Sequence, residues 1–308
     1  MHNGVSLAGC AFLTSLALAP ALAAERPLIK GIANFVVKTD NLEEVRKFYT
    51  GVLGYEEVFK HRRPGVAAEI AVFKVNDRQY IEVAQTLANE ADDKLIQIGF
   101  ETQDARKLRA YLAEKGWAVP AKAGKDSDGN YSFTVKDPED HTVEFVEYVK
   151  GSAHSRNFGK AISPHRISDH MLHVGVHVKS PEAQDKFYKD ILGFRFQWKG
   201  GPLDDRIDWI SLMVPDGDNW IEYMVSRGTP SPQQLGVWHH VAVGTLDIQG
   251  LYKTVVSRGY TPPREPNIAR DGRWLLQLYD KHNTRTEVMV RKPVQKPCCS
   301  ENLDPYAN

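Results

Sequence analysis

The chain has 308 residues, of which 42% are hydrophobic and 25% are charged, a balance typical of globular proteins. Its Lys and Arg residues and its Asp and Glu residues both number 39, so the formal net charge is zero. This balance, without a strongly basic cluster, argues against nucleic acid or an anionic membrane as a partner. The length allows two ordinary domains.

The first 24 residues are predicted to form a secretory signal peptide. Residues 5–24 include no charged side chain and are rich in Ala and Leu. Ala21 and Ala23 have the small-residue spacing that a signal peptidase recognises, which predicts cleavage after Ala23 or Ala24. Because Ser, Thr, Gly and Pro dilute the apolar run, it is a poor candidate for a stable membrane anchor. We therefore expect an exported protein, periplasmic or secreted.

An internal repeat organises the rest of the chain. Segments 42–55 and 181–194 both carry Phe-Tyr and then Leu-Gly followed by an aromatic residue. Phe48 and Phe187 are 139 positions apart (187 − 48), and further matches follow, so two copies of one module are predicted. The predicted domains are residues 1–24 (signal peptide), 28–149 (first module), 150–166 (linker), 167–292 (second module) and 293–308 (polar tail).

Each module is predicted to contain a strand, a helix and three further strands, and then the same series again. In the second module, alternation of apolar residues predicts strands such as 172–178 and 220–225. Asp247 is a plausible N-cap and Gly259 a plausible C-cap of a helix between strands. The predicted fold class is α+β, with four tandem βαβββ repeats. They form two cup-shaped modules with mixed sheets, each with helices on one face and a concave cup on the other.

The strand pattern also predicts a metal site. Every second side chain of a strand faces the same side of the sheet. If the apolar neighbours face the helices, four side chains on separate strands face the second cup: His173, Glu222, His240 and Glu287. Any one of these histidines alone would more often be structural, but two buried carboxylates without a cation would repel each other. We therefore predict one divalent metal ion, Zn, Ni, Co, Mn or Fe.

These features resemble the vicinal oxygen chelate superfamily, which includes glyoxalase I, extradiol ring-cleaving dioxygenases and bleomycin-binding proteins. The resemblance covers residues 28–292. It rests on the two Phe-Tyr…Leu-Gly segments and on the strand ends Asp137-Pro138…Glu144 and Asp280…Glu287. It implies metal ligands at the same four positions of the second module.

The equivalent positions of the first module hold different residues: Asn34, Glu82, Gln97 and Glu144. Both imidazoles are replaced by amides, which are poor ligands for a transition metal. The resemblance therefore implies a degenerate first module, without a catalytic metal, and a metal-bearing second module.

The resemblance also implies that the metal chelates neighbouring oxygens of a small-molecule substrate. In a glyoxalase-like isomerase or lyase all four positions are ligands, and Glu222 or Glu287 acts as general base. In an extradiol dioxygenase, only His173, His240 and Glu287 hold iron. The quartet therefore favours an isomerase or lyase, and a non-catalytic small-molecule or metal-binding protein is a third possibility.

Ring-cleaving relatives have two further acid–base residues, a His before the second ligand and a Tyr ten residues before the Glu. Here no His lies between His177 and His239, and the second position holds Gln277, with Tyr279 nearby. The dioxygenase is therefore the alternative rather than the first hypothesis. The substrate and the oligomeric state stay open.

Other residues of the second half are weaker candidates. Three arginines are candidates to bind a substrate carboxylate, although each alone is more often solvated: Arg206, Arg264 and Arg273. Cys298 and Cys299 are adjacent in the polar tail. Neighbouring cysteines rarely pair with each other, which leaves a bond to another chain or weak metal binding as possible roles. The favoured interpretation of this tail is a disordered end.

Overall fold

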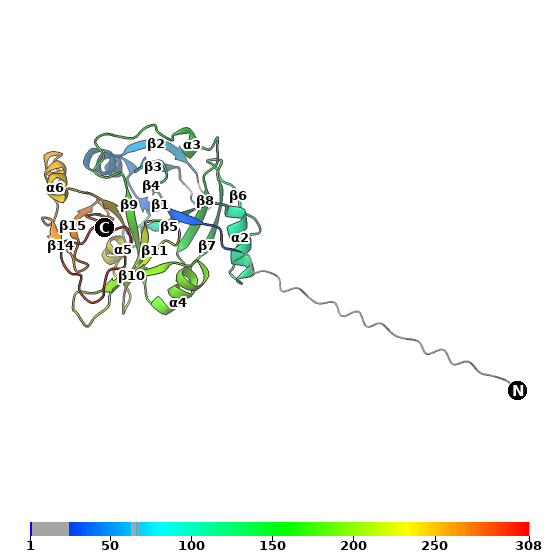
Figure 1. Ribbon diagram of the computed structural model, residues 1–308. Coiled ribbons are helices and arrows are strands. Elements are labelled where there is room, and N and C mark those ends of the chain that lie inside the picture. The colour runs from blue at the N-terminus through cyan, green and yellow to red at the C-terminus, as the bar shows by residue number, and fades with distance from the viewer. Residues whose placement is uncertain (2–24, 63–65, 67, 308) are drawn as a thin grey trace.

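The computed structural model describes residue 1 and residues 25–62, 66 and 68–307. The predicted signal peptide, apart from Met1, lies outside the described residues. Two mixed sheets of eight strands carry the fold (Figure 1). Their strand orders are equivalent, β2-β3-β4-β1-β5-β8-β7-β6 and β10-β11-β12-β9-β13-β16-β15-β14. The predicted α+β fold with four βαβββ repeats in two modules is therefore confirmed.

The strands of the first sheet are β1 (Ile29–Thr39), β2 (Glu56–His61), β3 (Ile70–Lys74), β4 (Tyr80–Gln85), β5 (Leu95–Thr102), β6 (Gly124–Lys125), β7 (Tyr131–Lys136) and β8 (Thr142–Glu147). Those of the second are β9 (Met171–Val178), β10 (Arg195–Gly200), β11 (Trp209–Met213), β12 (Trp220–Val225), β13 (His240–Gly244), β14 (Asn267–Ile268), β15 (Trp274–Tyr279) and β16 (Arg285–Met289). In each sheet the first strand of a repeat pairs in parallel with the last strand of that repeat, as β9 does with β12 and β13 with β16.

A helix follows the first strand of every repeat. These helices are α1 (Leu42–Arg46), which continues as the π-helical η1 (Lys47–Val52), α2 (Ala105–Glu114), α4 (Pro181–Asp185), which continues as η2 (Lys186–Ile191), and α6 (Ile248–Ser257). Two further helices are α3 (Ala153–Arg156), in the predicted linker, and α5 (Pro232–Trp238), before β13. The predicted cap is confirmed, because the Asp247 side chain accepts a hydrogen bond from the Gly250 backbone N–H at 2.8 Å. Gly259, at φ +83°, ends the same helix in the left-handed region.

The helices of the two modules pack against each other. One continuous apolar core includes buried side chains from both sheets and their helices. Trp117 stacks on Phe187 across the modules with ring centroids 4.5 Å apart, and Phe48 contacts Tyr260 at 5.8 Å. Burial of this shared core stabilises the pair of modules as one unit. It also leaves the opposite face of the second sheet free to form the cup.

The C-terminal tail is ordered against the second module, so the predicted disordered end is wrong for residues 293–307. Leu303 donates its backbone N–H to Gln197 O at 2.9 Å. The fully buried side chain of Asp304 pairs with Arg273 at 3.2 Å and Arg291 at 3.1 Å. Arg273 also pairs with Asp271 at 2.9 Å and Arg291 with Asp218 at 3.3 Å, so the tail adds a carboxylate that the two arginines share.

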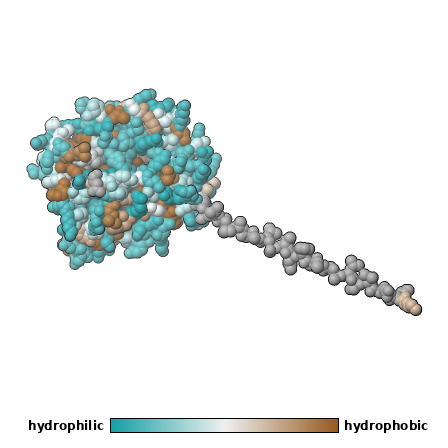
Figure 2. Space-filling model, viewed as in Figure 1, coloured by the Kyte–Doolittle hydropathy of each residue, from teal (hydrophilic) through white to brown (hydrophobic). Residues whose placement is uncertain are grey.

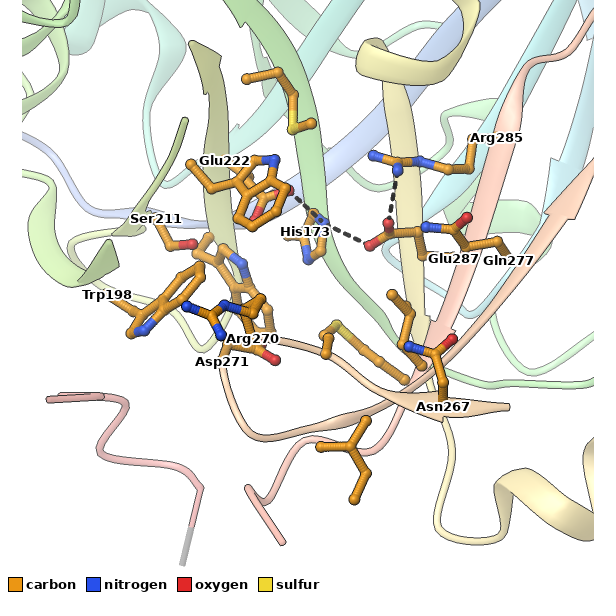
Figure 3. A pocket seen from close by; sticks show the side chains of 17 residues that line it. His173, Trp198, Ser211, Glu222, Asn267, Arg270, Asp271, Gln277, Arg285 and Glu287 are labelled. Carbon is orange, nitrogen blue, oxygen red and sulfur yellow. Dashed lines mark ion pairs between the residues drawn. The ribbon is translucent and has the colours of Figure 1, made fainter. Parts of the chain in front are cut away.

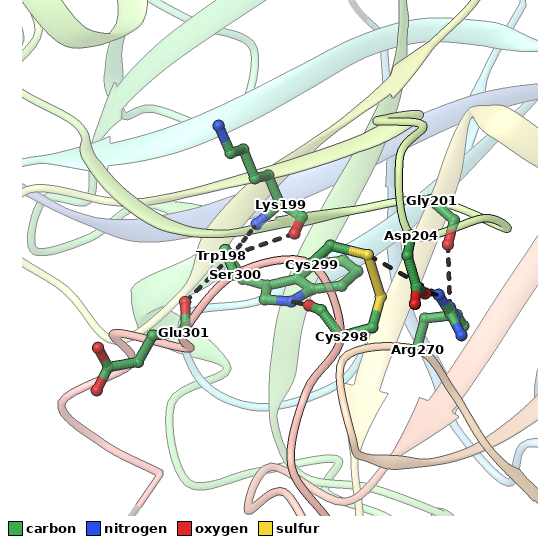
Figure 4. The surroundings of a disulfide bond; sticks show 9 residues. All are labelled: Trp198, Lys199, Gly201, Asp204, Arg270, Cys298, Cys299, Ser300 and Glu301. Atoms are coloured by element: carbon green, nitrogen blue, oxygen red, sulfur yellow. Dashed lines mark hydrogen bonds and ion pairs between the residues drawn. A yellow bond between two sulfur atoms is a disulfide. The ribbon is translucent and has the colours of Figure 1, made fainter.

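The tail also contains a disulfide between Cys298 and Cys299, contrary to our expectation that adjacent cysteines would stay unpaired (Figure 4). Trp198 of β10 donates its Nε1–H to Cys298 O at 3.1 Å, and Cys298 donates its backbone N–H to Arg270 O at 2.9 Å. The cysteine pair therefore lies over the end of β10 and the turn after β14.

Within the described residues, every helix is too short or too polar to cross a membrane. On the face shown in Figure 2, hydrophobic residues are scattered among hydrophilic ones over the globular part.

Candidate metal centre

The register of the second sheet brings the four predicted site residues together. In one row across the cup, Glu222 of β12 pairs with Gly175 of β9, and Gly175 pairs with His240 of β13. In the next row His173 of β9 pairs with Ala242 of β13, which pairs with Glu287 of β16. Small residues therefore occupy the centre of each row, and the larger polar side chains converge above them.

The converging atoms are close enough to share one ion. His173 Nε2 lies 3.0 Å from His240 Nε2 and 3.5 Å from Glu287 Oε2. Glu222 Oε2 lies 3.7 Å from His173 Nε2 and 3.5 Å from His240 Nε2. One nitrogen or oxygen atom from each of the four residues lies within 4.8 Å of the others. Ligand atoms that share a first-row metal at about 2.1 Å lie roughly 3.0–3.5 Å apart, so this set fits such an ion. Figure 3 shows three of the side chains, His173, Glu222 and Glu287, pointing toward one another.

The surroundings of His240 suit a metal ligand. Its Nδ1 lies 3.0 Å from Trp238 O and 2.9 Å from Arg285 Nη2. In the tautomer with the hydrogen on Nδ1, that nitrogen donates to Trp238 O and Nε2 presents a lone pair to the other three residues. Orientation of a ligating imidazole through a backbone carbonyl is typical of metal-binding histidines. Burial, and then the charge of Arg285, lower the pKa of His240, which keeps the imidazole in its neutral, metal-binding form.

Glu287 is also in its ligating state. Burial by itself raises the pKa of Glu287, but the charge of Arg285 and the close approach of the two imidazoles outweigh it, so the pKa falls well below its usual range. Glu287 is therefore ionised at neutral pH. Two carboxylates that face one point repel each other without a cation between them.

Gly175 provides the space for the His240 ring. A Cβ at this position would lie 2.0 Å from His240 Cε1 and 2.2 Å from His240 Nδ1. Gly175 does not have a positive φ, so the backbone does not require glycine here. The requirement comes from the close approach of the imidazole.

A cavity of about 260 Å³ opens beside the four residues. Trp198, Trp209 and Trp220 line it, and the first two stack at 6.5 Å with their planes 17° apart. Trp220 also contacts His173 at a ring-centroid distance of 5.0 Å. The cavity therefore combines polar groups at the quartet with aromatic walls, as small-molecule sites do.

None of the three arginines proposed from sequence lines this cavity. Arg273 is buried behind it, paired with Asp271 at 2.9 Å, and Arg206 pairs with Asp208 at the surface. Arg285 is the arginine next to the quartet, 3.1 Å from Glu287 Oε1, and sequence reasoning missed it. The signal was available, because residue 285 is two positions before Glu287 on one strand and shares its face.

Two other residues that we weighed lie on the neighbouring strand. Gln277 pairs with Glu287 across β15 and β16 and lines the cavity. Tyr279 shares its face and donates its hydroxyl to Gln277 Oε1 at 2.9 Å. Burial raises the pKa of Tyr279, which keeps the phenol protonated.

The equivalent positions of the first module form a hydrogen-bonded network. The Asn34 and Gln97 side chains both donate to Glu144 Oε2, at 2.8 and 2.9 Å. Glu82 instead contacts His61 Nε2 at 2.9 Å. Val36 stands where the second module has Gly175, at the position paired with Gln97, and packs in a small apolar cluster. Two amide side chains therefore donate to one carboxylate in this cup, and Val36 stands at the position of the glycine that makes room for the His240 ring in the second module.

Comparisons with known proteins agree with this architecture. The sequence profile described as the Glyoxalase/Bleomycin resistance protein/Dioxygenase superfamily matches residues 31–145 and 170–288. No curated protein matches the chain.

Three solved structures illustrate the fold-level similarity. An extradiol ring-cleaving dioxygenase from B. fuscum has a TM-score of 0.65 at 16% identity, covering 93% of this chain and 77% of that one. The 2,3-dioxygenase LapB from Pseudomonas sp. KL28 has a TM-score of 0.66 at 17% identity, covering 89% and 97%. A Mn(II)-bound glyoxalase from Novosphingobium aromaticivorans has a TM-score of 0.61 at 19% identity, covering 86% and 83%.

Proposed function

The chain belongs to the glyoxalase/bleomycin resistance protein/dioxygenase superfamily, and on that premise we propose that its second module is a metal-dependent isomerase or lyase acting on a small oxygenated molecule. His173, Glu222, His240 and Glu287 would hold one divalent ion, which would polarise neighbouring oxygens of the substrate and stabilise negative charge on them. The observation that carries the proposal is the position of Glu222, a second carboxylate beside the other three residues.

Glu222 is the residue best placed to move a proton. Its side chain is 15% exposed, against 7% for Glu287, 2% for His173 and 0% for His240. It lines the cavity on the side of Ser211 and Trp209, whereas Glu287 is held by Arg285. A Glu222 oxygen that does not bind the metal could therefore accept a proton from a C–H group next to a carbonyl and return it to a neighbouring atom.

The second candidate is an extradiol dioxygenase, and Tyr279 is the observation in its favour. Its protonated hydroxyl lies on the cup side of β15, the same face as Gln277 two residues earlier on the strand. It is not among the residues that line the cavity, so the isomerase or lyase remains the first proposal.

Proton exchange tests the proposal without knowledge of the substrate. The purified protein is loaded separately with zinc, nickel, cobalt, manganese or iron. Each form is incubated in D2O with small ketones, aldehydes, 2-oxo acids and 2-hydroxy acids. NMR then follows deuterium incorporation at the carbon next to the oxygenated one. We expect metal-dependent exchange that is lost in Glu222→Gln and kept in Glu265→Gln, an exposed carboxylate outside the cup.

The result that contradicts the proposal is equally direct. Exchange that survives in Glu222→Gln would remove its role as base. Oxygen uptake by the iron-loaded protein with catechols, without proton exchange, would establish the dioxygenase instead.

A further inference from the structure

Arg285 is a buried cation at the edge of the quartet, 6% exposed. Its Nη1 contacts Glu287 Oε1 at 3.1 Å, and its Nη2 lies 2.9 and 3.2 Å from the two ring nitrogens of His240. Within the described part of the chain, its Nε has no hydrogen-bond partner. In Figure 3 the guanidinium extends over the Glu287 carboxylate toward the cavity, whose lining includes Arg285.

The hydrogen bonds of Arg285 are incomplete once His240 acts as a ligand. When a metal takes the Nε2 lone pair of His240, the hydrogen of the neutral ring lies on Nδ1, which faces Trp238 O at 3.0 Å. Neither ring nitrogen can then accept from Arg285 Nη2, although they lie 2.9 and 3.2 Å from it. The Nε–H and the Nη2 N–H that faces His240 would therefore lack an acceptor, which is an unfavourable state for a buried cation.

A count of the charges around the cavity leads to the same residue. Arg270 forms an ion pair with Asp204, and Asp271 with Arg273 at 2.9 Å, so these lining charges are already balanced. The remaining charged groups of the lining are Glu222, Glu287 and Arg285. Imidazoles that bind a metal are neutral and carboxylates that bind one are ionised, so Glu222 and Glu287 would balance a divalent ion and the charge of Arg285 would be left over. The metal-loaded site therefore carries one excess positive charge in a largely buried setting.

We propose that the substrate binds as an anion, with a carboxylate that accepts hydrogen bonds from Arg285 and lies next to the oxygen that the metal chelates. This inference rests on the proposed metal-dependent function. It specifies the substrate class as a small 2-hydroxy or 2-oxo carboxylate. The aromatic walls at Trp198 and Trp209 suit an apolar or single-ring substituent, and a cavity of about 260 Å³ accommodates a molecule of that size. A planar guanidinium is well matched to a carboxylate.

The test uses a matched pair of ligands, mandelate and its neutral isostere mandelamide, titrated into the full chain loaded with cobalt(II). The visible absorption of cobalt reports metal binding first and ligand binding second. We expect mandelate to bind at least about tenfold more tightly than mandelamide, the effect of one charge-assisted contact. In Arg285→Gln that preference should fall to about threefold or less, and Arg285→Lys should restore part of it. Arg195→Gln, which removes an exposed arginine that does not line the cavity, should keep the full preference.

The outcomes separate the two proposals. A native protein that binds no cobalt would overturn the metal-dependent function and this inference with it. Cobalt binding without preference for mandelate, or a preference that persists in Arg285→Gln, would overturn the inference alone. If Arg285→Gln does not take up cobalt, the comparison of the two ligands on the native protein and on Arg285→Lys decides the question. Equal binding of the two ligands to both proteins would refute the anionic substrate.

Discussion

Replacement of Gly175 by alanine tests the geometry of the candidate metal centre without removing a ligand. The new Cβ would lie 2.0 Å from His240 Cε1, whereas carbon atoms in ordinary contact are about 3.5–4.0 Å apart. The imidazole would have to move by about 1.5 Å or more. His240 is fully buried and lies 3.0 Å from Trp238 O, so a shift of that size would break this contact and move the ring away from the other three residues.

The magnitude follows from the tolerance of metal coordination, about 0.2 Å in each ligand distance. A displacement of about 1.5 Å breaks the His240 contact, so we expect metal affinity to fall at least about 100-fold. Overpacking should lower the free energy of unfolding by only about 1–3 kcal/mol, which leaves the variant folded. Competition with a chromophoric chelator measures the affinity, and circular dichroism the fold.

Gly244→Ala in β13 is the matched control, because its Cβ would make 3.4 Å contacts with the flexible Leu172 side chain. It should bind metal as the native protein does. If Gly175→Ala binds metal within about threefold of the native affinity, the imidazole is not a ligand in the described position, and our account of the site is refuted.

Three further predictions concern the rest of the second module. Asp304→Ala should lower the free energy of unfolding by about 3 kcal/mol, because it removes the carboxylate that Arg273 and Arg291 share. Urea titration followed by tryptophan fluorescence measures the change, and a value below about 0.5 kcal/mol would show that the tail does not stabilise the module. Burial lowers the pKa of His177 from its ordinary 6.5 to about 4, so the unfolded chain binds this proton at a higher pH than the folded chain does. The free energy of unfolding is therefore greatest above pH 6.5 and declines as the pH falls toward 4. His177→Phe, which keeps an aromatic ring stacked on Trp238, should flatten that decline, and an unchanged pH profile would contradict the prediction. Joint replacement of Cys298 and Cys299 by serine should change the free energy of unfolding by less than about 1 kcal/mol, because a bond between adjacent residues constrains little of the unfolded chain; a larger loss would show that the disulfide itself fixes the tail.

Much of this architecture follows from local rules that the sequence obeys. The repeated Phe-Tyr…Leu-Gly segments mark equivalent helices, and strand alternation turns His173, Glu222, His240 and Glu287 to one face. That these four meet at one point depends only on the strand order that the repeat imposes. Strand alternation also places Arg285 on the face of Glu287. No sequence pattern, however, showed that the charged residues around the cavity would leave the positive charge of Arg285 without a balancing anion.

Other features depend on contacts between distant residues and left no local signal. The tail after residue 292 is polar, as disordered ends are, yet its Asp304 pairs with the buried Arg273, thirty-one positions earlier. In the first module, Val36 fills the place of Gly175, and His61 reaches Glu82 from a neighbouring strand. The local sequence of a segment does not show which distant segment packs against it, so these contacts could not be predicted.

Metal analysis of the purified protein tests the central claim most directly. The protein is reconstituted with zinc, nickel, cobalt, manganese or iron, dialysed, and measured by mass spectrometry of the elements. We predict one tightly held divalent ion per chain, lost in His240→Ala and kept in Gln97→Ala, the equivalent position of the first module. A native protein that holds no metal, or an equal metal content in all three proteins, would contradict the account.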